Sequence, residues 1–109
     1  MRTLLTLTAV AVALAFAPAG AKAADYTLTL KNHRFTPSEI KVPANKRVKL
    51  TVINDDATPE EFESHKLRVE KVIAGKAKAV VRIGPLKPGS YPFVGEYHED
   101  TAKGVVIAE

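Results

Sequence analysis

The sequence predicts an all-β fold, a Greek-key β-sandwich built from two antiparallel sheets. Three observations support this fold class. After residue 24 apolar and polar side chains alternate with a period of two, no window shows the 3.6-residue period of an amphipathic helix, and Pro, Gly or Asn interrupts the alternation at short intervals. A chain of 109 residues has room for one such domain and not for two.

The first 23 residues have the pattern of a secretory signal peptide. A short basic start is followed by an apolar run from Leu4 to Ala17 and by the small-residue site Ala21-Lys22-Ala23. The apolar run is shorter than the roughly 20 residues that span a bilayer. We therefore expect cleavage before Ala24, a mature domain of residues 24–109 in the periplasm, and no membrane insertion of the mature chain.

Seven short strands are expected in the mature domain. Pro43-Ala44-Asn45-Lys46 and Gly75 mark turns between them, because Pro fixes φ and Asn and Gly tolerate left-handed backbone. The segment Leu86 to Tyr91 is typical of a tyrosine corner, in which the ring hydroxyl bonds to the backbone a few residues upstream. Immunoglobulin-type sandwiches also have this feature and stay open as an alternative. The expected strands are residues 26–31, 40–42, 48–53, 67–69, 77–83, 91–95 and 105–108.

The charge distribution argues against nucleic acid as a partner. The whole chain has 16 basic and 12 acidic residues, but Arg2 and Lys22 belong to the expected signal peptide. The mature domain then carries 14 basic residues and a net charge of only +2. No basic stripe interleaved with aromatic residues is present in the sequence.

Most of the acidic residues lie in two short segments without Lys or Arg, residues 55–63 and 96–100. We expect the first in the loop between the third and fourth strands, and the second between the last two strands. Carboxylates held close together repel one another, and a bound cation offsets this repulsion. The sequence therefore indicates a candidate metal site, although a solvated acidic surface explains the composition alone about as well.

The candidate ligands follow from the parity of an extended chain, in which alternate residues share a face. Glu61, Glu63 and His65 share one face, and Glu96 and His98 share another, opposite Gly95 and Tyr97. We expect Glu70 to support a ligand or to belong to a second site, and His33 to be a surface residue outside the site. The expected site draws on Glu63 and His98, with Glu61, Glu96 and His65 for the remaining positions.

The last strands resemble the cupredoxin family. Tyr91-Pro92-Phe93-Val94-Gly95-Glu96-Tyr97-His98, followed by Lys103-Gly104, is similar to the family's Y-x-F-x-C-x-x-H run with its downstream Met and Gly. Phe35-x-Pro37-x-x-Ile40-x-Val42 and Val52-x-Asn54-x-Asp56 also resemble family signatures. The resemblance implies that the two acidic segments meet at one end of the sandwich around a metal ion.

The departures from this pattern exclude a blue-copper centre. By the resemblance, Gly95 stands in the place of the Cys, Lys103 in that of the axial Met, and Glu61 or Glu63 near that of the first His, so only His98 is retained. A type 1 site needs a thiolate, and this chain has no Cys. Carboxylate and imidazole ligands together suit Cu(II), iron, manganese or zinc.

Three segments resemble a narrower group, the cysteine-free cupredoxin-like proteins that accompany bacterial ferrous-iron permeases, including the amino-terminal domain of Efe-type uptake proteins. The segments are residues 61–64, 84–89 and 96–98. The resemblance implies a periplasmic protein that binds a copper or iron ion and assists iron uptake beside an inner-membrane permease, with Fe(II) oxidation as its proposed role. Two alternatives remain: a copper(II)-binding or buffering protein, and a metal-free interaction module.

Overall fold

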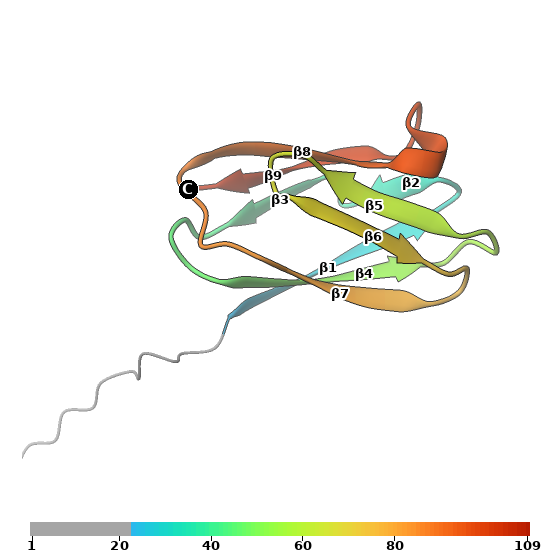
Figure 1. Cartoon of the computed structure of the whole chain (residues 1–109), viewed down its shortest axis with the longest axis horizontal. Helices are drawn as coiled ribbons and strands as arrows, with labels where there is room; N and C mark the ends of the chain where they lie inside the picture. Colours follow the sequence, from blue (N-terminus) through green and yellow to red (C-terminus); the bar gives the residue numbers. More distant parts are fainter. Residues whose placement is uncertain (1–22) are drawn as a thin grey trace, which may run out of the picture.

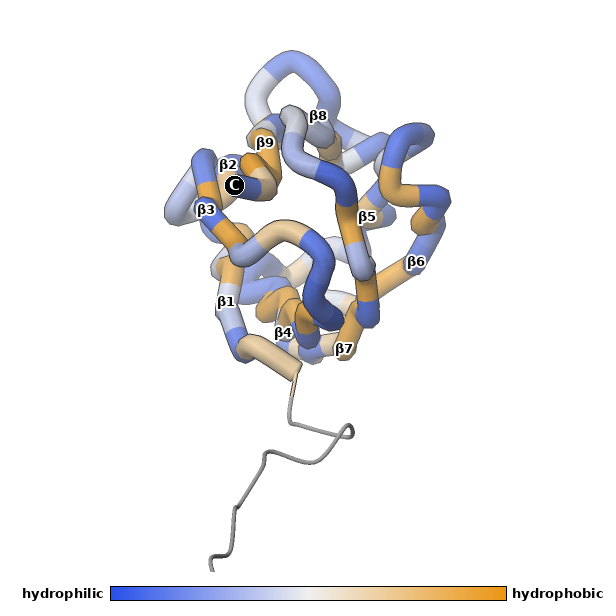
Figure 2. The backbone as a smooth tube through the Cα atoms, turned by 90° about the vertical axis from the view of Figure 1, so that its left-hand side faces the viewer, coloured by the Kyte–Doolittle hydropathy of each residue, from blue (hydrophilic) through white to orange (hydrophobic). Residues whose placement is uncertain are grey.

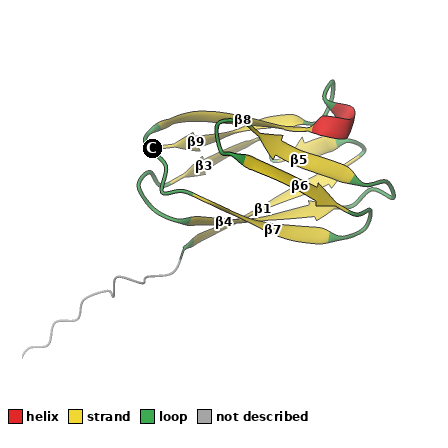
Figure 3. Ribbon diagram, in the orientation of Figure 1, coloured by secondary structure: helices red, strands yellow, loops and turns green. Residues whose placement is uncertain are grey.

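The computed structural model describes residues 23–109, so the expected signal peptide lies, apart from its last residue, outside the described residues. Two β-sheets pack face to face, and a single turn of 3₁₀ helix stands at one end (Figures 1 and 3). The elements are β1 (Ala24–Lys31), β2 (Arg34–Thr36), β3 (Glu39–Val42), β4 (Val48–Asn54), β5 (Glu60–Ser64), β6 (Val69–Ile73), β7 (Lys78–Ile83), β8 (Gly89–Gly95), η1 (Glu96–His98) and β9 (Lys103–Ala108).

The predicted all-β sandwich is confirmed, but its two sheets are mixed and not purely antiparallel. One sheet has the order β2-β1-β4-β7 and the other the order β3-β9-β8-β5-β6. The pairs β1–β4 and β3–β9 are parallel. Only residues 37–38 separate β2 from β3, so the chain crosses from one sheet to the other without reversing. The next turn then returns β4 in the direction of β1.

The segment Glu60–Ser64 is strand β5, which corrects the expectation of a loop there. It lies between β6 and β8 and pairs with both, over its whole length with β6 and at Phe62 and Glu63 with β8. Glu60, Phe62 and Ser64 face the interior, and Glu61 and Glu63 face outward. Because three of its five residues are Glu, the segment lacks the composition typical of a strand. Its position between two strands of the sheet and the burial of Phe62 stabilise it as a strand.

The expected fourth strand also shifts along the chain. Leu67 lies in a turn and β6 begins at Val69. The other expected strands are present within a few residues of their predicted bounds, and β2 and β5 are additional. Asn45 has a φ of 60°, as the expected turn requires.

The core lies between the two sheets and centres on three phenylalanine rings. Phe35, Phe62 and Phe93 pack with ring centroids 5.0 to 6.0 Å apart, and Phe35 meets the other two edge-on. Such contacts add about 0.5 to 1.5 kcal/mol per pair beyond the area that they bury. Apolar and polar segments alternate along the strands that enclose this core (Figure 2).

Two polar side chains fix the ends of the sandwich. The Tyr91 hydroxyl donates to the Lys87 carbonyl at 2.7 Å, which confirms the predicted tyrosine corner. At the other end the buried Asn54 amide donates to the carbonyls of Thr58, Ile73 and Ala74, and thereby shapes the loop before β5. Within residues 23–109, no helix has the length and apolar character needed to cross a bilayer.

Candidate functional site

One end of the sandwich brings together three segments that are distant in the sequence. They follow β1, β4 and β8, whose carboxyl ends lie at the same end of the molecule (Figure 1). The first contains His33, the second leads into Glu60, and the third contains η1 with His98. The bonds of Glu60 to Tyr97 and His98 confirm that the two acidic segments meet.

A buried carboxylate holds this end together. Glu60 is only 2% exposed, and its Oε1 accepts hydrogen bonds from the backbone N–H of Glu61 at 3.0 Å and of Tyr97 at 2.8 Å. Its Oε2 lies 2.6 Å from His98 Nδ1. An ionised carboxylate can only accept, so in a pair of a carboxylate and a neutral imidazole Nδ1 donates and Nε2 of His98 keeps a free lone pair.

His33 belongs to this site, which corrects its expected place outside it. Its ring stacks on that of His98 with centroids 3.5 Å apart and an angle of 11° between the planes. The backbone N–H groups of Asn32 and His33 donate to the Asp56 carboxylate at 2.7 and 2.9 Å. Burial opposes ionisation of Asp56, but these two hydrogen bonds and the charges of His33 and Lys31 together outweigh it and hold the Asp56 pKa below its usual range. Asp56 therefore fixes the turn that places His33 over His98.

A cluster of four glutamates lies beside the Glu60–His98 pair. Glu61 and Glu63 are on the outer face of β5, Glu70 is opposite Glu63 on β6, and Glu96 comes from η1. A hydrogen bond with the Glu96 side chain raises the pKa of Glu63 to about 7, and burial and the charges of Glu96 and Glu70 add to this rise. Burial raises the pKa of Glu61, and the charges of Glu96 and Glu70 reinforce the effect. These carboxyls are therefore close enough to compete for protons.

The structure brings only some of the expected ligands into contact with one another. Glu61 and Glu63 each interact with Glu96, whereas His98 bonds to Glu60. His65 is exposed in the turn after β5, and its charge acts on Glu63 to lower the pKa. Within residues 23–109, no three or more His, Asp or Glu side chains are close enough together to hold a metal ion in the positions that they have here.

The expectation that Glu96 and His98 share an extended face is wrong, because residues 96–98 form a 3₁₀ turn. Successive side chains of such a turn point about 120° apart, so the parity of a strand does not apply. This turn directs Glu96 toward β5 at Glu63 and His98 toward Glu60.

The geometry does not fit a type 1 copper centre. Gly95, in the place of the Cys by resemblance, packs against the Glu60 carboxyl. The residue beside Gly95 on the following segment is Ala102, which is fully buried. Lys103 is exposed and does not take an axial position. The groups beside Gly95 are thus a carboxylate hydrogen-bonded to an imidazole, and neither supplies the sulfur that a type 1 site needs.

Period-two alternation could have revealed Glu60, because it has the same parity as Phe62 and Ser64 on the inner face of β5. The extended segment expected from the sequence begins at Glu61 and therefore omits Glu60. No comparable signal marks His33, which reaches the site only through the turn that Asp56 holds.

We predict that Gly95→Ala destabilises the domain by about 1 to 3 kcal/mol, as overpacking in a tight core does. A Cβ atom at Gly95 would come within 2.6 Å of Glu60 Cδ and 2.8 Å of Ala102 Cβ. Urea unfolding measures the loss. The penalty should shrink in a Glu60→Ala background, where space is freed, and an undiminished penalty there would contradict the proposed contact.

Comparisons with known proteins agree with this fold. The sequence profile of a family described as a cupredoxin-like domain matches residues 4–108. An uncharacterized protein of Rickettsia prowazekii (strain Madrid E) is 41% identical over 80 residues, which are 73% of this chain. The chain spans 64% of the length of that relative.

Solved structures with the same fold include two copper proteins. Auracyanin A, a blue copper protein from Chloroflexus aurantiacus, matches with a TM-score of 0.68 and 10% identity over 81% of this chain and 100% of that chain. The metal-binding domain of the Cu(I)-exporting P-type ATPase CopA of Streptococcus pneumoniae matches with a TM-score of 0.67 and 14% identity over 78% and 84%. At these identities the likeness concerns the fold.

Proposed function

The chain belongs to the cupredoxin-like domain family, and from this premise we propose that it is a metal-binding member which holds an iron or copper ion on carboxylate and imidazole groups. Electron transfer at a type 1 centre is not part of this proposal, because Gly95 and Ala102 supply no sulfur. The copper proteins that share the fold support metal binding by this chain.

The observation that carries the proposal is the contact of Glu63 with Glu96. Two carboxylates are stable side by side when they share a proton or a cation. The pKa of Glu63, about 7, reflects a proton shared with Glu96. An ion that replaces the proton would gain both carboxylates at once, with Glu61 adjacent. Oxygen ligands favour hard ions, so iron is the first candidate and copper(II) the second.

His98 has the orientation of a metal-binding histidine. Such residues usually donate one ring N–H to a carboxylate, which fixes the ring and makes the other nitrogen more basic. The 2.6 Å contact of Nδ1 with Glu60 provides this arrangement and leaves Nε2 for the ion. Glu60 then acts as a positioning residue, because the backbone of Glu61 and Tyr97 also engages it.

The role that we propose for this site is the delivery of iron in the periplasm to an inner-membrane permease. The signal-like segment 1–23 and the resemblance of residues 61–64, 84–89 and 96–98 to proteins of ferrous-iron uptake support this role. A copper(II)-buffering protein would use the same ligands, and a metal-free module would use none. The following two experiments separate these functions.

We predict that Fe(III) or Cu(II) raises the melting temperature of the purified protein and that Glu63→Gln and Glu96→Gln remove most of the rise. Each change keeps the side-chain shape but removes a charge. Glu39→Gln, a matched change at an exposed position of β3, should keep the full rise. If no metal raises the melting temperature of the parent protein, the metal-binding proposal is wrong and the metal-free interaction module is favoured. A rise with Cu(II) alone would favour copper buffering.

In cells, we predict that iron uptake through the partner permease falls when Glu63→Gln or His98→Ala replaces the natural residue. Uptake of radioactive iron, normalised to the amount of exported protein, measures the effect. Full uptake by both variants at normal protein level would contradict an iron role, whatever metal the purified protein binds.

A further inference from the structure

We propose that the opposite end of the sandwich carries an anion site for a phosphate ester, built from Arg47, Lys49 and Arg82. A cavity of about 220 Å³ opens there between the start of β4 and the end of β7. Its lining residues are Ala23, Arg47, Val48, Lys49, Arg82, Ile83 and Gly84. In Figure 1 this end, where β1 begins, lies far from η1, so the site is separate from the candidate metal site.

Two of the cations face each other across a strand pair. Lys49 of β4 and Arg82 of β7 are directly opposite in the antiparallel register, which places their Cβ atoms about 5 Å apart. Like charges at such a position destabilise a sheet unless an anion lies between them. None of the three cations forms an ion pair with a carboxylate of residues 23–109. Asp25 of β1 is the register partner of Lys49, but its exposed side chain forms no ion pair with Lys49 or Arg82.

The backbone fixes the third cation at the rim of the cavity. The Ala24 N–H donates to the Arg47 carbonyl at 3.1 Å, which ties the start of β1 to the turn before β4. Gly84 has a φ of 89°, and a Cβ atom there would lie 2.7 Å from the Lys46 carbonyl oxygen. Only glycine allows β7 to end this close to the turn that carries Arg47. With the expected cleavage, Ala23 is lost from the lining of the cavity, and the α-ammonium of Ala24 adds a positive charge beside Arg47.

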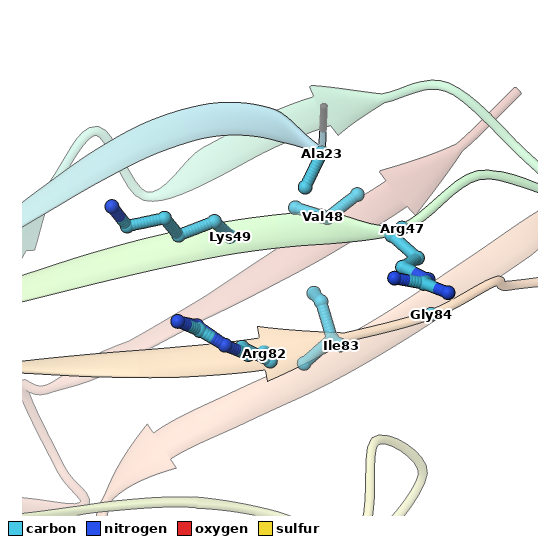
Figure 4. Close-up of a pocket in the computed structure, with 7 residues that line it drawn as sticks. All are labelled: Ala23, Arg47, Val48, Lys49, Arg82, Ile83 and Gly84. Atoms are coloured by element: carbon cyan, nitrogen blue, oxygen red, sulfur yellow. The ribbon is translucent and has the colours of Figure 1, made fainter. Parts of the chain in front are cut away.

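The charges around the cavity indicate the class of ligand. Figure 4 shows Lys49 and Arg82 extending in the same direction along facing strands, whereas Arg47 lies beside Gly84 at the other end of the cavity. The guanidinium group of an arginine can donate two parallel hydrogen bonds to two oxygens of one phosphate. The ammonium group of a lysine adds a positive point charge. Val48 and Ile83 are almost completely buried and face the core, so the contacts with a ligand come from the charged head groups. Glycerol phosphate and the head group of an anionic phospholipid share this chemistry.

The test measures binding of glycerol 3-phosphate by calorimetry and of phosphatidylglycerol vesicles by sedimentation, both at constant ionic strength. We expect the purified protein to bind at least one of them, and Lys49→Gln/Arg82→Gln to weaken that binding at least about tenfold, as the loss of charged hydrogen bonds does. The control Lys41→Gln/Lys71→Gln removes the same charge from exposed positions of the other sheet and should change binding less than twofold.

Stability without ligand separates a binding role from a structural one. Because Lys49 and Arg82 repel, the variant lacking both charges should unfold at the same urea concentration as the parent or a higher one. Binding of the soluble ester identifies a small-molecule site, and binding of vesicles alone identifies a lipid head-group site. The proposal is overturned if neither probe binds, or if the control pair weakens binding as much as the pocket pair.

Discussion

Glu60→Ala should lower the free energy of unfolding by about 3 kcal/mol, which for a domain of this size lowers the melting temperature by roughly 12 to 24 °C. Glu60 is 2% exposed and accepts hydrogen bonds from two backbone N–H groups and from His98. Alanine leaves all three donors without their acceptor and opens a cavity next to Gly95. The loss therefore combines broken polar contacts with lost packing.

Urea unfolding followed by circular dichroism measures this loss, with Glu39→Ala as the control for an exposed glutamate. Glu60→Gln should cost less than Glu60→Ala, since the amide keeps the volume and one acceptor oxygen. A loss below about 1 kcal/mol for Glu60→Ala would show that water replaces the carboxylate, and Glu60 would then have no role in organising this end of the sandwich.

The second large effect concerns pH. The melting temperature of the metal-free protein and the rise in melting temperature that a metal ion causes should change in opposite directions with pH. The Glu63 pKa rises from an ordinary 4.5 to about 7 in the folded state, first through the hydrogen bond with Glu96. A raised carboxyl pKa favours the protonated folded form, so its contribution to stability is complete below pH 4.5 and is lost as the pH rises through about 7. Without metal, the melting temperature should therefore fall over this range.

A metal ion reverses the trend, because it binds the carboxylate and competes with the proton. The metal-induced rise in melting temperature should be large above pH 7 and should fade as the pH falls below the Glu63 pKa of about 7. An ion at about a hundredfold excess over its Kd stabilises by about 2.7 kcal/mol. Glu70 and His65 also act on Glu63, the first raising and the second lowering its pKa.

Glu63→Gln should flatten both curves, since glutamine does not titrate. Differential scanning fluorimetry from pH 5 to pH 8.5, with and without Fe(III) or Cu(II), gives the two curves. A metal-induced rise that is equally large at pH 5.5 and pH 8 would mean that the ion does not bind at Glu63.

The alternation of residues in β1, β4 and β7 could be recognised directly, because each of these strands places apolar residues on one face. The tyrosine corner was predictable for a similar reason, since its hydroxyl bonds within four residues. Strand β5 was not, because five residues containing three Glu become a strand only when β6 and β8 pair with them.

The sequence by itself determined the sandwich, the absence of cysteine and the presence of two acidic segments. These follow from composition and from contacts within a few residues. The tertiary structure decided that Glu60 and not Glu63 holds His98, and that His33 stacks on the same ring. Those contacts join residues 38 and 65 positions apart, and their geometry depends on the 3₁₀ turn and on the turn fixed by Asp56. Local patterns carry no information on contacts of such separation, so only the packed sandwich could select the partner of each side chain.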